Sequence, residues 1–409
     1  MKTFNVPIIY RSPLITAIKE RRRQLDKMKK DFTPTLLDFG SLQIFLARHF
    51  GFCYGVENAI EIAFRTIEDN PGKRIFLLSE MIHNPQVNAD LLARGVRFLQ
   101  DTYGSELISI NELRADDIVI TPAFGTTLEM ESRLHAIGIR TEKYNTTCPF
   151  VERVWNRSEQ IARKNYTVII HGKPQHEETR ATFSHAASNA PALILNDMED
   201  AKKLAGYLRK EKPVELFYQE FSGRFSPGFD VTRDLAQIGV VNQTTMLASD
   251  TQDIADFLKQ TMTETYGLPA GAAPDKHFAD TRDTLCYATN DNQTAVTHML
   301  STPADMAFVV GGYNSSNTSH LVELCEKALP THFVNDAQKI LSREALLHFD
   351  FHQKKEILVN GYWPSASPVR ILLTSGASCP DALVEGVVQK LVSVSGTQIP
   401  VEEMTRQFS

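Results

Sequence analysis

The chain has 409 residues, of which 42% are hydrophobic and 22% charged, the composition of an ordinary globular protein long enough for two or three domains. The formal net charge of −6 argues against nucleic acid as a partner, and no apolar run approaches the ~20 residues that would place the chain in a membrane. The five cysteines are odd in number and widely spaced, which argues against a disulfide framework.

Residues 1–43 are expected to form an N-terminal extension. Its first residues, MKTFNVPIIY, lack the long apolar core and the cleavage site of a secretory signal. The following stretch IKERRRQLDKMKK is basic but contains Glu20 and Asp26, whereas transit peptides are poor in acidic residues. We interpret it as a solvated amphipathic helix, with a targeting segment as the alternative, and predict a cytoplasmic location.

From residue 44 onwards, short apolar runs alternate with helical patterns, which predicts βαβ units and mostly parallel sheets. The connecting loops recur three times in one order, namely a cysteine loop, a polar loop and a hydroxyl-rich loop. This recurrence predicts an α/β fold class with three pseudo-repeated α/β domains. The expected segments are repeats at 44–142, 143–250 and 280–395, a connecting helix and linker at 251–279, a C-terminal tail at 396–409, and insertions near 205–230 and 345–368.

One cysteine opens each predicted repeat and stands directly before a helical pattern: Cys53, Cys148 and Cys286. A helix N-terminus favours a thiolate, and thiolates are the ligands of soft metals and iron–sulfur clusters. Loops beyond the carboxyl ends of parallel strands form ligand sites. The three loops are therefore predicted to face one central cavity and to hold a 4Fe-4S cluster by three of its irons, leaving the fourth for a substrate.

Simpler interpretations of the cysteines stay open. Isolated cysteines are usually buried small hydrophobic residues, and a structural zinc site would lack its fourth ligand. Cys325 lies at helical spacing from Leu321 and Leu329 and is interpreted as a core residue. Cys379 is interpreted as a packing residue, with ligation or reactivity as the alternative.

Two later loops have the composition of an anion site. GGYNSSNTSH offers Asn314, Ser315, Ser316 and Asn317 between a strand and a helix, and TSGASCPD offers Ser378 in a loop of small residues. Hydroxyls, amides and free backbone N–H groups at a helix start bind phosphates. Ordinary helix capping is the alternative for both loops.

Three further loops offer groups that bind phosphate or move protons. MIHNP contains His83, KPQHEETRAT contains His176 and the two carboxyl groups Glu177 and Glu178, and NQTTM contains Thr244. Histidines donate hydrogen bonds to phosphate oxygens, and a carboxyl group in a dry cavity serves as a proton donor. Structural histidines and a plain helix cap are the alternatives.

Taken together, these loops resemble the 4-hydroxy-3-methylbut-2-enyl diphosphate reductase family (IspH/LytB), in its plant and cyanobacterial branch. The resemblance runs from about Phe52 to Leu391. The pieces that carry it are GFCYGVENA, EMIHNPQVN, TTCPFVERVW, HGKPQHEETRAT, NQTTML, LCYAT, GGYNSSNTSHL and TSGASCPD.

The resemblance implies a fold, a reaction and roles for single residues. The family fold has three α/β domains around a central 4Fe-4S cluster, and the reaction is reductive dehydroxylation of the allylic diphosphate to isopentenyl and dimethylallyl diphosphate. Cys53, Cys148 and Cys286 would ligate the cluster. Glu178, Thr244 and His176 would serve catalysis, Glu178 on the proton path and Thr244 beside the substrate hydroxymethyl group. The implied diphosphate-binding residues are His83, His176, Ser315, Ser316, Asn317 and Ser378.

The chain departs from the family pattern at Phe124 in PAFGTT, where shorter bacterial members have a phosphate-contacting histidine. Thr126 or Thr127 is a candidate to replace that contact. Because the sequence has no GxGxxG fingerprint of a bound nicotinamide or flavin, electrons are expected from ferredoxin or flavodoxin. The alternatives are an iron–sulfur sensor or electron-transfer protein without substrate, and a zinc-dependent or thiol hydrolase of phosphorylated substrates.

Overall fold

The computed structural model describes residues 4–267, 276–279 and 284–409 of the chain. The chain forms two compact units, and two of the four boundaries between them fall inside α2 (Tyr54–Asp69) and α3 (Pro85–Ala93). Unit 1 comprises Met1–Glu61, Ile82–Asn88 and Tyr287–Ser409, and unit 2 comprises Ile62–Met81 and Ala89–Cys286. Each unit is described by itself.

Unit 1 is built on a sheet in the order β1-β2-β14-β10-β11, in which β1 and β2 are antiparallel and the other pairs parallel. Its strands are β1 (Thr35–Asp38), β2 (Leu42–Leu46), β10 (Met306–Val310), β11 (Thr331–Val334) and β14 (Val369–Ser375). An antiparallel hairpin of β12 (Ala345–Asp350) and β13 (Lys355–Asn360) forms a separate two-stranded sheet. The remaining elements of unit 1 are η1 (Ile8–Tyr10), α1 (Pro13–Leu25), α11 (Tyr287–Met299), α12 (Ser316–Glu326), η4 (Ala337–Lys339), α13 (Asp381–Ser395) and α14 (Val401–Phe408).

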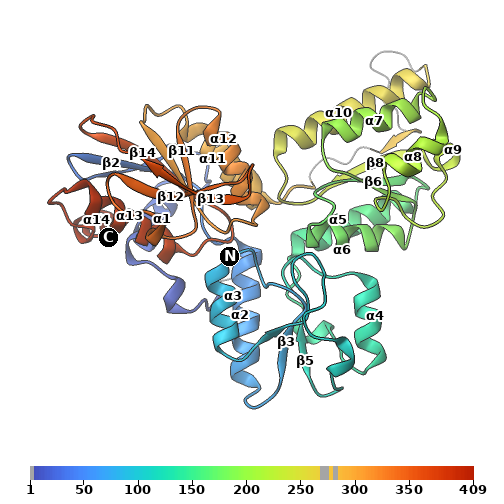
Figure 1. Ribbon diagram of the computed structural model, residues 1–409, viewed down its shortest axis with the longest axis horizontal. Coiled ribbons are helices and arrows are strands. Elements are labelled where there is room, and N and C mark those ends of the chain that lie inside the picture. The colour runs from blue at the N-terminus through green and yellow to red at the C-terminus, as the bar shows by residue number, and fades with distance from the viewer. Residues whose placement is uncertain (1–3, 268–275, 280–283) are drawn as a thin grey trace. The chain divides into compact units, whose positions relative to one another are not determined.

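Helices cover both faces of this sheet, and the alternation of side chains along β10 shows how. Phe308 and Val310 pack into a cluster with residues of α1, α13 and α14, whereas Ala307 and Val309 pack with residues of α11 and α12. Successive side chains of a strand point to opposite faces of the sheet, so both sets are buried only when helices cover both faces. Figure 1 shows α1 and α13 on one side of the sheet and α11 and α12 on the other.

Unit 2 contains two smaller parallel sheets, in the orders β4-β3-β5 and β7-β6-β8-β9. The strands are β3 (Ile75–Leu77), β4 (Arg97–Phe98), β5 (Ile118–Ile120), β6 (Thr167–His171), β7 (Ala192–Leu195), β8 (Ile238–Asn242) and β9 (Phe278–Ala279). The helical elements are η2 (Ile110–Glu112), α4 (Leu128–Ala136), η3 (Glu142–Tyr144), α5 (Pro149–Ala162), α6 (Glu177–Ala187), α7 (Met198–Leu208), α8 (Val214–Glu220), α9 (Val231–Asp234) and α10 (Ala248–Thr265).

Both sheets of unit 2 are also layered between helices. Along β6, Ile169 packs with residues of α7, α8 and α10, whereas Val168 and Ile170 pack with α5 and α6. The smaller sheet has α4 on one side and α2 and α3 on the other (Figure 1). The predicted fold class, α/β with mostly parallel sheets, is therefore confirmed.

The predicted segment boundaries stay predictions, and parts of the segments that begin at 251 and 280 lie outside the described residues. The structure does show that the chain before residue 44 contributes α1 and β1 to the core of unit 1.

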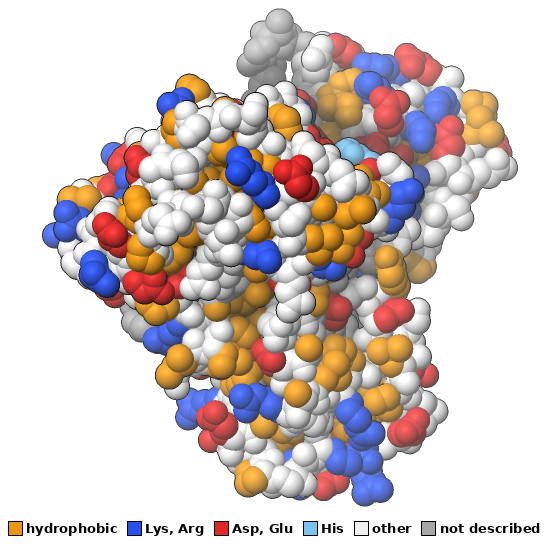
Figure 2. Space-filling model, turned by 60° about the vertical axis from the view of Figure 1, so that its left-hand side comes forward, with side chains coloured by type: hydrophobic (Ala, Val, Ile, Leu, Met, Phe, Trp, Pro, Cys, Tyr) orange, Lys and Arg blue, Asp and Glu red, His pale blue; other side chains and the backbone are white. Residues whose placement is uncertain are grey.

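No helix in the described part of the chain is long and apolar enough to cross a bilayer. Charged side chains of both signs are scattered over the face drawn in Figure 2, in keeping with the small net charge.

Candidate active site

The three predicted ligand cysteines all stand directly before a helix. Cys53 precedes α2, Cys148 is the N-cap residue of α5, and Cys286 precedes α11. All three are partly exposed, whereas Cys325 and Cys379 are fully buried. Cys325 packs with Leu321 in the core, as its spacing predicts. Burial thus separates the three repeat cysteines from the two packing cysteines.

In unit 1, one loop joins most of the predicted site residues. The Ser378 hydroxyl donates to the backbone oxygen of His83 at 3.1 Å, and the Ala377 N–H donates to Oδ1 of Asn317 at 2.8 Å. The Cys53 N–H donates to the Ala377 oxygen at 3.1 Å. We call Cys53, His83, Ser315, Ser316, Asn317 and Ser378 the unit 1 cluster.

Two glycines allow the loops of this cluster to approach each other closely. A Cβ atom on Gly312 would lie 2.3 Å from the backbone oxygen of His83, and one on Gly376 would lie 2.0 Å from Oγ1 of Thr318. Both distances are far below van der Waals contact, so only glycine fits at either position. Gly312 is a site residue that the motifs alone did not predict, although a Gly-Gly pair after a buried strand is a signal of close backbone approach.

The start of α12 has more polar groups than capping requires. Ser315 is the N-cap residue, and its hydroxyl accepts from the Thr318 N–H at 3.3 Å. Ser316 and Asn317 follow it, both about 3% exposed. Among the described residues, Nδ2 of Asn317 and Oγ1 of Thr318 are buried without a hydrogen-bond partner. Buried polar groups are normally satisfied, so this combination at a helix N-terminus fits a bound anion.

In unit 2, Glu178 and Thr244 form a two-point contact. The Glu178 carboxylate, 1% exposed, accepts hydrogen bonds from both the N–H and the hydroxyl of Thr244, the latter at 3.0 Å. The Thr244 oxygen in turn accepts from the Cys286 N–H at 3.3 Å. The carboxyl group, the hydroxyl and one predicted ligand thus lie along one chain of hydrogen bonds.

His176 is the N-cap residue of α6, and its Nδ1 accepts from the Glu178 N–H at 3.2 Å. A neutral ring that accepts at Nδ1 carries its proton at Nε2, so Nε2 is the donor. The ring of Phe124 packs edge-on against His176 with centroids 5.5 Å apart. Phe124 therefore supports the His176 ring and offers no donor of its own, while the proposed role of Thr126 or Thr127 stays a prediction. We call Cys148, His176, Glu178, Thr244 and Cys286 the unit 2 cluster.

The electrostatics at Cys148 differ from the sequence expectation that the helix N-terminus favours a thiolate. Burial raises the pKa of the Cys148 thiol to about 12, and the nearby Cys286 and Glu178 add to the rise. The N–H groups of Phe150 and Val151 act in the opposite direction but do not outweigh burial. A thiolate in this setting requires a compensating cation, because burial disfavours an isolated charge. The thiol at Cys148 is chemically suited to be a thiolate ligand of iron, although no group of three or more His, Cys, Asp or Glu side chains that could hold a metal ion is gathered in the described part of the chain.

Comparisons with known proteins show the family of the chain. The family model described as LytB protein matches residues 44–392. A protein of Cyanothece sp. named 4-hydroxy-3-methylbut-2-enyl diphosphate reductase is 36% identical, over 95% of this chain and 90% of the relative. A protein of Synechococcus sp. with the same name is 38% identical, over 94% of this chain and 89% of the relative.

A solved structure has the same fold. The E-1-hydroxy-2-methyl-but-2-enyl-4-diphosphate reductase from Plasmodium falciparum superimposes with a TM-score of 0.60 at 21% identity, covering 85% of this chain and 87% of that one. The relatives from Cyanothece and Synechococcus are cyanobacterial, in line with the predicted branch. The chain therefore belongs to the LytB protein family.

Proposed function

We propose that this chain is a 4-hydroxy-3-methylbut-2-enyl diphosphate reductase. The substrate takes up two electrons and two protons, loses its hydroxyl group as water, and gives isopentenyl or dimethylallyl diphosphate. The observation that carries the proposal is the buried Glu178 carboxylate, hydrogen-bonded to Thr244 next to Cys286. This contact supports the proposal because the reaction requires a proton-exchanging group beside the metal site.

Cys53, Cys148 and Cys286 are the proposed ligands of one 4Fe-4S cluster. When bound, the cluster supplies electrons one at a time and a Lewis-acidic iron for the departing oxygen. The support is the shared position of the three thiols directly before helices and their partial exposure, which the two fully buried cysteines do not have. Because burial disfavours a free thiolate at Cys148, loading of iron should release the thiol proton and be coupled to pH.

The diphosphate is assigned to His83, His176, Ser315, Ser316, Asn317 and Ser378. The support is that Nδ2 of Asn317 is buried without a hydrogen-bond partner at the start of α12, where helix N–H groups favour an anion. Nε2 of His176 is a further donor, because Nδ1 is occupied by the Glu178 N–H. Binding energy from the non-reacting diphosphate would hold the carbon skeleton in its reactive orientation.

Glu178 and Thr244 are assigned to proton delivery. A protonated Glu178 passes its proton to Thr244 Oγ1 while the hydroxyl proton moves on to the substrate oxygen, so the leaving group departs as water. His176 fixes the first turn of α6 and with it the carboxyl group of Glu178. The hydroxyl of Thr244 and its backbone N–H hold the carboxylate at two points, which fixes its position beside the hydroxyl. For the transfer, the protonated carboxyl group becomes the donor and the Thr244 hydroxyl the acceptor.

An iron–sulfur sensor or electron-transfer protein without substrate is the weaker alternative. It accounts for the cysteines but gives no role to the buried Asn317 amide or to the contact between Glu178 and Thr244. A zinc-dependent or thiol hydrolase of phosphorylated substrates is a further alternative, and a structural zinc held by the three cysteines would lack its fourth ligand. Ferredoxin or flavodoxin as the electron donor, and a cytoplasmic location, remain part of the proposal.

The decisive experiment is anaerobic turnover of 4-hydroxy-3-methylbut-2-enyl diphosphate with a reduced viologen as donor. Enzyme with a full cluster, seen as broad absorbance near ~400 nm, should consume the substrate and release both diphosphate products. Glu178→Gln should keep the cluster spectrum and lose about 10²–10⁴-fold in turnover. No consumption by fully clustered wild-type enzyme refutes the proposal.

The cluster ligands have a matched control within the chain. Cys53→Ser should lower the iron content and abolish turnover, while Cys325→Ser, in the core of unit 1, should cost stability and leave the iron content unchanged. Equal iron content in the two variants would remove Cys53 from the ligand set. Colourless protein with stoichiometric zinc after anaerobic purification would favour the hydrolase.

A further inference from the structure

The N-terminal segment packs directly on the loop that carries Cys53. The ring of Phe4 meets Tyr54 edge-on with centroids 4.8 Å apart, and Tyr10 meets Phe52 at 5.9 Å. Further along, Nζ of Lys19 in α1 lies 4.8 Å from the centre of the Phe50 ring. The N-terminal segment and α1 are therefore in contact with residues on both sides of Cys53.

The chain from Ile18 to Lys30 is strongly basic within a protein of net negative charge. It contains seven basic and two acidic residues. One acid, Asp26, pairs with the half-buried Arg48 at 3.5 Å, and the nearby Asp31 pairs with Arg22 at 3.0 Å. The acidic groups of this region are thus already engaged by inward-facing arginines.

Apart from the exposed Arg21, which lines a groove beside α14, four basic side chains of this stretch are at the surface: Arg23, Lys27, Lys29 and Lys30. All are exposed, and only Arg23 has a carboxylate nearby, with Glu20 at 3.8 Å. Among the described residues, the three lysines have no carboxylate within ion-pair distance. We call these four residues the basic surface.

The basic surface is joined to the Cys53 loop by packing and by its electrostatic field. Phe32, just after the lysines, packs edge-on against His49 with ring centroids 5.7 Å apart. Burial, aided by the charges of Arg48, Lys29 and Arg22, lowers the pKa of His49 to about 4. Positive potential therefore reaches the residues that immediately precede Cys53.

We propose that the basic surface docks a small acidic one-electron carrier protein, which delivers electrons on the side of Cys53. This inference rests on the proposed function, since the reductase needs two electrons that the chain cannot generate. Two reduced carriers would bind in turn, and each would be oxidised by one electron. Opposite charges raise the association rate of such short-lived complexes more than their affinity.

The experiment measures carrier binding and turnover separately. Clustered wild-type enzyme is titrated calorimetrically with an oxidised, acidic plant-type ferredoxin at several salt concentrations, and its turnover is driven either by the reduced ferredoxin or by a reduced viologen. The test variant is Arg23→Glu/Lys27→Glu/Lys30→Glu. A first control, Lys354→Glu/Lys355→Glu, reverses two exposed lysines at the hairpin of β12 and β13.

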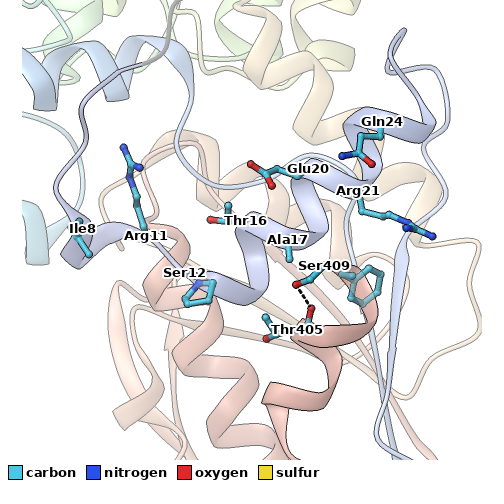
Figure 3. Close-up of a pocket in the computed structure, with 12 residues that line it drawn as sticks. Ile8, Arg11, Ser12, Thr16, Ala17, Glu20, Arg21, Gln24, Thr405 and Ser409 are labelled. Carbon is cyan, nitrogen blue, oxygen red and sulfur yellow. Dashed lines mark hydrogen bonds between the residues drawn. The ribbon is translucent and has the colours of Figure 1, made fainter.

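A second control lies on the same helix. Arg21 lines a groove of about 610 Å³ between α1 and α14, shown in Figure 3. Arg23 is not part of that lining and lies four residues beyond Lys19 in the sequence. Residues four apart share a helix face, so Arg23 lies on the flank of Lys19 and the Cys53 loop. Arg21→Glu changes the charge of α1 by the same amount as Arg23→Glu but at a different position.

The test variant should weaken ferredoxin binding and ferredoxin-driven kcat/KM at least tenfold, and the wild-type advantage should fade as salt rises. Viologen-driven turnover and the Lys354/Lys355 control should stay within twofold of wild type, and Arg21→Glu should lose less than Arg23→Glu. Unchanged ferredoxin binding in the test variant overturns the docking proposal, as does equal loss in the two single variants. Binding of anionic vesicles or nucleic acid in place of ferredoxin overturns it too. If wild-type enzyme does not turn over the substrate with reduced viologen, the proposed reductase function is refuted. This outcome differs from a loss that is confined to ferredoxin-driven turnover, so the two failures are distinguishable.

Discussion

Gly312 offers a quantitative test of the unit 1 cluster. In Gly312→Ala, the new Cβ would lie 2.3 Å from the backbone oxygen of His83, where an ordinary contact needs at least about 3.4 Å. The obstacle is backbone, so the loop after β10 and the His83 loop must separate by about 1 Å. Overpacking of this kind costs about 1–3 kcal/mol of stability.

The larger effect should appear in substrate binding. The same His83 oxygen accepts the Ser378 hydroxyl at 3.1 Å, so the displacement would loosen two proposed diphosphate contacts together. A misplacement of about 1 Å costs on the order of 10²-fold in kcat/KM. We expect KM for the substrate, and Ki for inorganic pyrophosphate, to rise about 10-fold or more while the cluster spectrum stays that of wild type.

Viologen-driven kinetics, pyrophosphate inhibition and a thermal melt on the same preparation test this reasoning. The matched control is Gly386→Ala in α13, where the nearest atom to the new Cβ is 3.8 Å away and alanine also suits the helix better. If Gly312→Ala is folded and shows the KM and pyrophosphate affinity of Gly386→Ala, then the loops of the unit 1 cluster do not bind the diphosphate.

Three further changes test other parts of the molecule. Thr244→Val removes one of the two hydrogen-bond donors to the buried Glu178, so urea unfolding should show a loss of about 1–3 kcal/mol in stability, and turnover should fall sharply. Thr244→Ser retains both donors and is the control. Equal activity of the two variants would contradict the proton path. Burial lowers the pKa of His332 to about 4. Below about pH 6.5 the ring is therefore protonated in the unfolded chain but not in the folded protein, so stability is lost as the pH falls from 6.5 towards 4. At pH 5 this loss amounts to about 2 kcal/mol, and His332→Phe should show a pH dependence of unfolding that is smaller by that amount; an unchanged dependence would refute the assignment. Tyr10→Ala uncovers Phe52 beside Cys53, so cluster absorbance should decay faster in air than in wild type, and an unchanged rate would show that this ring does not protect the cluster.

Local sequence determined the elements and the chemical character of the loops. A cysteine before a helical pattern, or a Ser-Ser-Asn run after an apolar run, is a feature of adjacent residues, and the structure has a helix at each of those places. The parallel sheets followed from the alternation of strand and helix patterns in the same way. Such features are decided by backbone propensity and side-chain periodicity, which neighbouring residues carry by themselves.

Only the tertiary structure decided which loops meet and how their groups ionise. Ser378 and His83 are far apart in the chain, and their contact depends on a glycine at position 312 whose role appears only when two backbones approach each other. The N-terminal segment looked like a solvated extension, yet Phe4, Tyr10 and Lys19 lie on the Cys53 loop. At Cys148, the helix N-terminus favours the thiolate and burial opposes it. Burial wins because it depends on every element packed around the sulfur, whereas the helix is the one contribution that the local sequence reveals.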